Sequence, residues 1–292
     1  MSDFPEINSW LSVTVVTDLE QKYMHALGRE NRRAVGKILQ KLRRVVARAH
    51  EDARQRLRRL AEGTLDPLGM PATTDLGQGY PEKLHLQTLK GYFGEVFAGL
   101  VAENLGPFGR DDWEVPAYLF RFHTVAFQQL GMMRQTGMAA RMIPGRTGDD
   151  CLAFRMNSDG EVIAALFCEA KCTADHDTGL ITEAHEKSSE ANLVPVDILQ
   201  VIEVLDDSKN PGAERWADAL RRLNWKGVSG SSTFERMDQV TYLCGRAPRR
   251  GKKSWIPSDK PHKKYTGGRK LHVAEIHLVD VEALVKRVYG VK

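Results

Sequence analysis

The chain has 292 residues, and its apolar fraction of 42% is enough for a hydrophobic core. The sequence has no signal-peptide pattern and no apolar run that approaches a membrane span, so we expect a cytoplasmic protein without a membrane partner. The four cysteines have neither CxxC nor zinc-ligand spacing. We therefore expect reduced core cysteines rather than a disulfide framework or a zinc site.

The net charge of +4 is unevenly distributed along the chain. Residues 29–62 hold 12 Lys/Arg and 4 Asp/Glu, and residues 246–270 hold 10 Lys/Arg and 1 Asp, which leaves a net charge of −13 on the remainder. Two concentrated basic segments on an acidic body indicate a polyanionic partner, although a basic face can also be merely solvated.

The N-terminal part is predicted to be mostly helical. Residues 7–16 have the composition of an early strand, and Asp18 is a candidate cap for a short helix that extends to Gly28. From Asn31 to Ala61, apolar residues recur at three-and-four spacing, and arginine and lysine fill the other face. This periodicity predicts a long amphipathic helix.

Residues 63–83 are rich in Gly, Pro and Thr, which is typical of a linker. We therefore predict an N-terminal helical, basic region with its linker over residues 1–83 and a second domain over residues 84–292. The second domain is predicted to begin with a helix from about Leu86 to Leu105, one side of which carries mostly small residues.

A β-hairpin is predicted in the middle of the second domain. Cys151 to Met156 and Glu161 to Cys172 are apolar runs, and Asn157-Ser158-Asp159-Gly160 between them is typical of a turn. The second run is apolar on both faces, so we expect it to be buried within the sheet. Two acids, Asp149 and Asp150, precede the first strand.

Acids and a lysine are predicted to converge at one end of this hairpin. Glu169 and Lys171 lie two residues apart in one strand and therefore share a face. If the strands pair across the turn without a bulge, Asp150 lies opposite Phe167 and points to that same face. Asp149 points to the other face, and a single bulge would exchange the two aspartates.

Two neighbouring carboxylates repel each other unless a cation lies between them. Because Mg²⁺ binds through one or two carboxylates plus waters, Asp150 and Glu169 are candidate ligands of Mg²⁺ or Mn²⁺, with Asp149 in reserve. Lys171 beside them can orient or deprotonate a water and stabilise a charged transition state. These groups suit phosphodiester hydrolysis; a buried Glu169–Lys171 ion pair without a catalytic role is the alternative.

Asp150, an apolar strand, a turn, a second apolar strand and Glu169-Ala170-Lys171 together resemble the PD-(D/E)xK nuclease superfamily, over roughly residues 85 to 205. The resemblance implies an α/β, restriction-endonuclease-like core with a central mixed β-sheet flanked by helices, and Mg²⁺-dependent cleavage of nucleic acid. The sequence departs from many members because Asp149 stands where they have proline.

The same resemblance implies two further site residues. In the superfamily, a helix ahead of the hairpin often lends an acid, and Glu95 matches that position; Gln200 resembles a glutamine that some members place on the helix after the ExK motif. The chain is also loosely similar to the nucleases that bacterial antiphage systems such as Hachiman pair with a helicase. That similarity implies a role in antiviral defence and a helicase or sensor protein as partner.

The second basic segment is predicted to be a loop between two strands. Trp255 and Tyr265 lie among its cations. Lysine and arginine neutralise phosphates without reading sequence, and aromatic rings stack on unpaired bases. The predicted nucleic-acid contacts are Arg249, Arg250, Lys252, Lys253, Lys263 and Lys264, with Arg146 near the hairpin.

These patterns together predict a Mg²⁺-dependent endodeoxyribonuclease, and the sequence does not separate duplex DNA from single-stranded DNA or RNA, or a monomer from an oligomer. The alternative is a non-catalytic nucleic-acid-binding or regulatory subunit of a larger complex. Such a subunit would bind DNA in a salt-sensitive manner without cleaving it.

Overall fold

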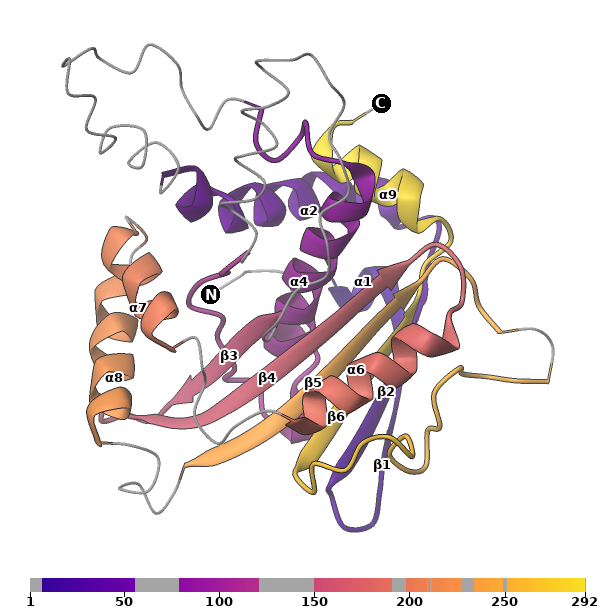
Figure 1. Ribbon diagram of the computed structural model, residues 1–292. Helices are drawn as coiled ribbons and strands as arrows, with labels where there is room; N and C mark the ends of the chain where they lie inside the picture. The colour runs from indigo at the N-terminus through magenta and orange to yellow at the C-terminus, as the bar shows by residue number, and fades with distance from the viewer. Residues whose placement is uncertain are drawn as a thin grey trace.

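The core of the molecule is a six-stranded β-sheet with helices on both faces (Figure 1). The computed structural model describes residues 7–55, 79–120, 150–190, 198–208, 210, 212–226, 234–248 and 251–291. The strand order is β1-β2-β6-β5-β4-β3. The four inner strands are parallel to one another, and the outer strands β1 and β3 are antiparallel to their neighbours. The predicted α/β class with a mixed sheet is confirmed.

The strands come from both ends and from the middle of the chain. Their bounds are β1 Leu11–Thr17, β2 Tyr23–Glu30, β3 Cys151–Met156, β4 Val162–Thr173, β5 Glu235–Cys244 and β6 Lys270–His277. Because β2 pairs with β6, the N-terminal strands belong to the same sheet as the predicted hairpin.

The N-terminal prediction was partly wrong. A short helix, α1 (Ile7–Trp10), precedes β1, and the helix expected between Asp18 and Gly28 is instead a turn followed by β2. Asp18 caps this turn, because its Oδ1 accepts a hydrogen bond from the Lys22 backbone N–H at 2.8 Å. Aspartate side chains stabilise turns and helix starts by the same kind of bond, so the residue alone does not separate the two.

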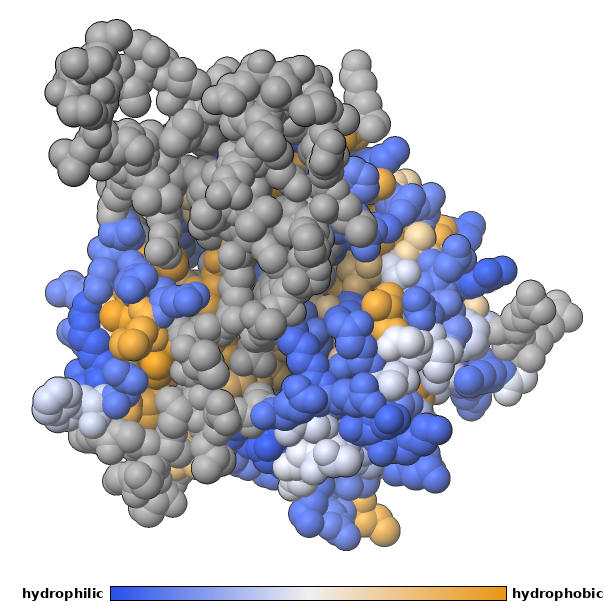
Figure 2. Space-filling model, viewed as in Figure 1, coloured by the Kyte–Doolittle hydropathy of each residue, from blue (hydrophilic) through white to orange (hydrophobic). Residues whose placement is uncertain are grey.

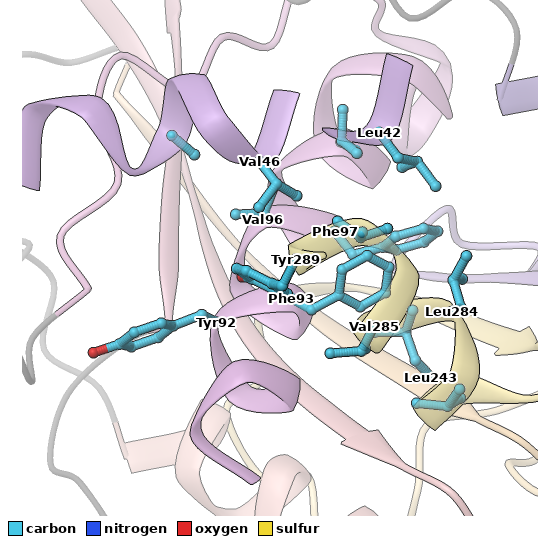
Figure 3. Packing of buried hydrophobic residues seen from close by; sticks show 14 of the residues in the cluster. Leu42, Val46, Tyr92, Phe93, Val96, Phe97, Leu243, Leu284, Val285 and Tyr289 are labelled. Atoms are coloured by element: carbon cyan, nitrogen blue, oxygen red, sulfur yellow. The ribbon is translucent and has the colours of Figure 1, made fainter. Parts of the chain in front are cut away.

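One face of the sheet is covered by α4 (Leu86–Asn104), on which α2 (Val35–Ala49) and α9 (Val281–Tyr289) pack. The helix predicted from Leu86 to Leu105 is confirmed by α4. The helix predicted from Asn31 to Ala61 is confirmed for α2 and for residues 51–55, and residues 56–61 lie outside the described part of the chain. Figure 3 shows the contact between the three helices, where apolar side chains interdigitate: Leu42 and Val46 from α2, Phe93, Val96 and Phe97 from α4, and Leu284 and Val285 from α9.

The small side of α4 lies directly on the sheet. A Cβ added to Gly94 would lie 3.3 Å from the Cβ of Cys172 and 3.6 Å from the Cβ of Ala170. The face of β4 that carries Ala170 and Cys172 therefore belongs to α4. Glu169 and Lys171 alternate with these residues and point to the other face.

That other face carries α6 (Thr178–Glu190) over β4 and β5. The helices α7 (Ile198–Asp207) and α8 (Ala213–Lys226) pack on each other and on the β3–β4 hairpin, around Phe154 and Phe167. A 3-10 turn, η1 (Pro107–Gly109), follows α4. None of the helices in the described ranges combines the length and apolarity needed to cross a membrane. Most of the predicted linker over residues 63–83 lies outside the described residues.

Candidate active site

The hairpin brings Asp150 and Glu169 together on the face that α6 covers. The last pair of the ladder is Cys151 with Cys168, and Asp150 and Glu169 are the residues that follow it outward on the two strands. The Asp150 backbone N–H donates a hydrogen bond to the Cys168 carbonyl at 3.0 Å. The Lys187 ammonium lies within ion-pair distance of both carboxylates, so they share a face, as the sequence predicted.

The register differs from the predicted one by two residues. Met156 pairs with Val162 rather than with Glu161, and a second shift falls between Arg155 and Met156. A shift of one residue moves a side chain to the opposite face, and a shift of two returns it. Asp150 therefore keeps its predicted face, but it lies beyond the Cys151–Cys168 pair instead of opposite Phe167. The alternative acid, Asp149, lies outside the described residues.

The Asp150 side chain is held by the backbone of the neighbouring strand. Its Oδ2 accepts a hydrogen bond from the Ala170 backbone N–H at 2.7 Å, and the residue is 9% exposed. Glu169 is 3% exposed. Two carboxylates are therefore removed from bulk water side by side, which is costly unless cations neutralise them.

Two lysines supply positive charge to this pair. Lys171 Nζ lies 3.1 Å from Glu169 Oε1 and 2.8 Å from Glu183 Oε1. Lys187 Nζ donates to Glu169 Oε2 at 2.5 Å and lies 3.7 Å from Asp150 Oδ1. Glu183 and Lys187 are one turn apart on α6, so both point toward β4.

Sequence reasoning missed Lys187 and Glu183. The only local signal is their four-residue spacing in a polar segment, which is common on solvated helices. The contact of α6 with β4 is tertiary, and nothing in the spacing of residues 169–187 specifies it. The structure adds these two residues to the predicted set of Asp150, Glu169 and Lys171.

The two lysines do not fully offset the burial of Glu169 and its repulsion by Asp150. Burial, and then the negative charge of Asp150, raise the pKa of Glu169 to about 7, although Lys187 and Lys171 act in the opposite direction. For Lys171, burial lowers the pKa, but Glu169, Glu183 and Asp150 outweigh it, so the pKa of the ammonium lies above its ordinary value. Lys171 is therefore a protonated group at neutral pH, suited to charge stabilisation rather than to proton removal.

The two residues implied only by the family resemblance do not join this cluster. Glu95 lies on α4, on the opposite side of the sheet from Glu169. Gln200 lies on the exposed side of α7, away from the sheet. Among the described residues, no three His, Cys, Asp or Glu side chains are arranged to hold a metal ion. Glu95 therefore does not form a metal-binding group with Asp150 and Glu169 among the described residues, and the role that the resemblance implies for it stays a prediction.

The pair nevertheless fits a hard divalent cation. Mg²⁺ needs only one or two carboxylates when waters fill the other positions. Glu169 Oε1 is buried and accepts no hydrogen bond from the described residues, despite its proximity to Lys171. An oxygen in that state, beside a second carboxylate, retains a lone pair for a cation. Asp150 and Glu169 are thus the residues that would hold Mg²⁺ or Mn²⁺.

The predicted basic loop borders α6 along its length. At one end Trp255 stacks on His176 with ring centroids 3.7 Å apart, and at the other Lys264 pairs with Glu186 at 2.8 Å. Arg269 donates to the Ser188 carbonyl at 2.8 Å, near the C-terminal end of α6. Figure 2 shows mainly hydrophilic residues over this part of the molecule.

The two aromatic rings of the loop have partners within the protein. Trp255 is stacked on His176 and has Lys252 5.3 Å from its ring centroid, and the Tyr265 hydroxyl donates to Asp238 at 2.7 Å. These contacts stabilise the loop, and stacking of the rings on unpaired bases stays a prediction. Of the predicted contact residues, Lys252, Lys253, Lys263 and Lys264 are exposed, whereas Arg146, Arg249 and Arg250 lie outside the described residues.

A separate cavity of about 630 Å³ lies between α2 and α8 and is lined by Arg44, Arg48, Arg215 and Trp216 among others. Neither Asp150 nor Glu169 contributes to it, so the carboxylate pair and this cavity are distinct features.

No model of a known protein family matches the chain, and no curated protein matches it at a significant level. The carboxylate pair and the elements that position it are therefore the features from which a function can be inferred.

Proposed function

We propose that the protein is a metal-dependent nuclease that hydrolyses DNA phosphodiester bonds, with Asp150 and Glu169 as ligands of Mg²⁺ or Mn²⁺. The observation that carries the proposal is that these two carboxylates are buried side by side at the end of the hairpin, with the Lys171 ammonium 3.1 Å from Glu169. A mixed sheet that carries this hairpin supports the resemblance to the restriction-endonuclease-like core of PD-(D/E)xK nucleases.

The chain's own residues have separate tasks in this mechanism. The Ala170 backbone N–H orients Asp150, and Glu183 holds Lys171 beside the site. Because Lys171 stays protonated, it orients the attacking water and stabilises negative charge on the phosphate without acting as the base. A bound divalent cation supplies a water of lowered pKa and polarises the phosphoryl oxygen.

DNA is the proposed substrate because the exposed lysines of the basic loop lie on the same face of the sheet as the carboxylates, beside α6. Such lysines bind the phosphate backbone through charge and without sequence preference. A role in antiphage defence, under the control of a helicase or sensor partner, rests on the family resemblance alone and is proposed on that ground.

The test is degradation of plasmid and linear DNA by the purified chain with Mg²⁺ or Mn²⁺. We expect cleavage by the wild type and a loss of at least about 100-fold for Asp150→Asn, Glu169→Gln and Lys171→Met. Lys22→Met removes an exposed lysine that pairs with Glu20 in the β1–β2 turn, outside the site and the basic loop, and serves as the control. Cleavage by Glu169→Gln at the wild-type rate would contradict the assignment.

One observation favours the alternative of a non-catalytic nucleic-acid-binding subunit. The Lys187 ammonium lies against both carboxylates, so the pair has a cation in the absence of any metal. A purely structural ion pair predicts salt-sensitive DNA binding with no cleavage in any divalent cation, and DNA affinity that is unchanged in Glu169→Gln.

A further inference from the structure

Lys187 lies where a divalent cation would be expected. Its Nζ is 2.5 Å from Glu169 Oε2 and 3.7 Å from Asp150 Oδ1, so one ammonium contacts both candidate ligands. A divalent cation held by Asp150 and Glu169 would have to occupy the same region as this ammonium. Two cations at one position repel strongly in a partly buried site, so the ammonium and the metal exclude each other.

The two lysines of the site differ in what else they contact. Lys171 has Glu183 as a second acid at 2.8 Å, outside the carboxylate pair. For Lys187, the acids within ion-pair distance among the described residues are Asp150 and Glu169. Lys171 can therefore keep an ion pair when a metal binds, whereas Lys187 must give up both of its ion pairs.

The position of Lys187 also permits it to leave. Its side chain is 25% exposed, compared with 3% for Glu169, and it comes from α6 rather than from the sheet. A lysine is a flexible four-carbon stem with a strongly hydrated head group, so rotation about its side-chain bonds returns the ammonium to water. No rearrangement of β3 or β4 is required.

We propose that Lys187 is a built-in counter-cation of this site: it neutralises Asp150 and Glu169 in the metal-free protein, and Mg²⁺ or Mn²⁺ binds only by displacing it. This inference rests on the proposed function, because it takes the carboxylate pair as the metal site. Lys187 thereby stabilises the metal-free fold and weakens metal binding, so the protein requires a higher divalent-cation concentration than the carboxylates alone would.

The test is calorimetric titration of MnCl₂ into the metal-free full-length chain, without DNA. We expect Lys187→Met to bind Mn²⁺ about tenfold more tightly than the wild type, because the cation no longer competes with an ammonium. Lys264→Met is the matched control, since it removes another lysine paired with α6 and is expected to keep the wild-type affinity. The heat that is lost in Asp150→Asn identifies the part of the signal that comes from Mn²⁺ binding at this site.

Thermal unfolding gives a second readout. Without metal, Lys187→Met leaves two buried carboxylates with less positive charge, so its midpoint is expected to fall below that of the wild type. Saturating Mn²⁺ is expected to raise the midpoint of Lys187→Met more than that of the wild type. Lys187→Gln, which retains a hydrogen-bond donor, replaces Lys187→Met if the latter does not fold.

The outcomes separate the inference from the proposed function. Mn²⁺ binding that Asp150→Asn abolishes and Lys187→Met leaves equal or weaker would overturn the counter-cation role while keeping the metal site. Absence of any Asp150-dependent Mn²⁺ binding, in the wild type and in Lys187→Met, would overturn both.

Discussion

At the scale of single residues, the two lysines of the site differ in their contacts and therefore in their proposed roles. Lys171 and Lys187 both contact Glu169. Among the described residues, the second acid of Lys171 is Glu183, which lies outside the carboxylate pair and acts as a tether, whereas the second acid of Lys187 is Asp150. A tethered ammonium keeps its position when the charge of the site changes, which suits a group that must meet a transition state. Glu183 is therefore expected to influence catalysis without being a metal ligand.

Glu183→Gln tests this tether. The carboxylate is largely exposed, so solvent screens its interaction and we expect a modest effect, a fall in the rate of DNA cleavage of about three- to tenfold. The affinity for Mn²⁺ should stay unchanged, because Asp150 and Glu169 are intact. Single-turnover cleavage and calorimetry measure the two quantities separately, and a large loss of Mn²⁺ affinity in this variant would place Glu183 among the ligands instead.

At the scale of elements, α4 depends on small residues where it meets its neighbours. A Cβ on Gly99 would lie 2.3 Å from the Tyr118 hydroxyl oxygen and 2.9 Å from Cζ of that ring, whereas a Cβ on Gly91 would meet nothing within 4 Å. The Tyr118 hydroxyl also donates to the Val96 carbonyl at 3.3 Å. Gly99 is thus tightly packed against Tyr118, whereas Gly91 on the same helix faces open space.

Alanine substitutions at these glycines should have opposite effects on stability. Gly99→Ala displaces Tyr118 and is expected to lower the free energy of unfolding by about 1–3 kcal/mol. Gly91 is exposed and helical, so Gly91→Ala is expected to raise the free energy of unfolding by about 0.5–1 kcal/mol. Urea denaturation of both variants decides the point, and equal midpoints would mean that α4 does not approach the 113–120 segment as closely as these distances indicate.

The basic loop is anchored by one buried carboxylate on β6. Glu275 accepts hydrogen bonds from the backbone N–H groups of Trp255 (2.6 Å) and Ile256 (3.0 Å). It also contacts His25 on β2 and His277. Burial alone would raise the pKa of Glu275, but these hydrogen bonds outweigh it and lower the pKa to about 2 from an ordinary value of 4.5.

This shift predicts an acid-sensitive contribution to stability. Because the folded pKa lies below the unfolded one, the contribution is complete above about pH 4.5 and is lost as the pH falls toward 2, in total about 3 kcal/mol. Glu275→Gln should flatten the stability profile in that window and lower stability at pH 7. It should also speed tryptic cleavage at Lys252 and Lys253. An unchanged acid profile would show that Glu275 does not anchor the loop.

The elements differ in how far the sequence predicts them. The β3–β4 hairpin and α4 were predicted correctly because turn residues and apolar periodicity are local signals. The strand β2 was not, because its run from Tyr23 to Ala26 is buried on both faces and lacks the alternation of a half-exposed strand. The approach of Lys187 to Glu169 depends on how α6 packs, which no local pattern encodes.

At the scale of the whole molecule, α2 and the described part of the basic loop lie on opposite sides of the sheet. The helix α2 packs on α4 and α9, whereas the loop borders α6 on the face that carries Asp150 and Glu169 (Figure 1). A DNA backbone that reaches the carboxylates must therefore pass the loop, and α2 is on the far side. The exposed lysines of the loop, rather than the cations of α2, are expected to hold the substrate.

Two neutralised variants distinguish the segments. Replacing Lys252, Lys253, Lys263 and Lys264 by glutamine should weaken DNA binding and reduce the slope of log affinity against log salt by about 0.9 for each phosphate that the loop no longer neutralises. Replacing Lys37, Arg44 and Arg48 of α2, all exposed, should change neither quantity appreciably. Fluorescence anisotropy with a short labelled duplex, in a Glu169→Gln background that prevents cleavage, measures both. A lower slope for the α2 variant with an unchanged slope for the loop variant would move the substrate to the opposite face and separate DNA binding from the carboxylate pair.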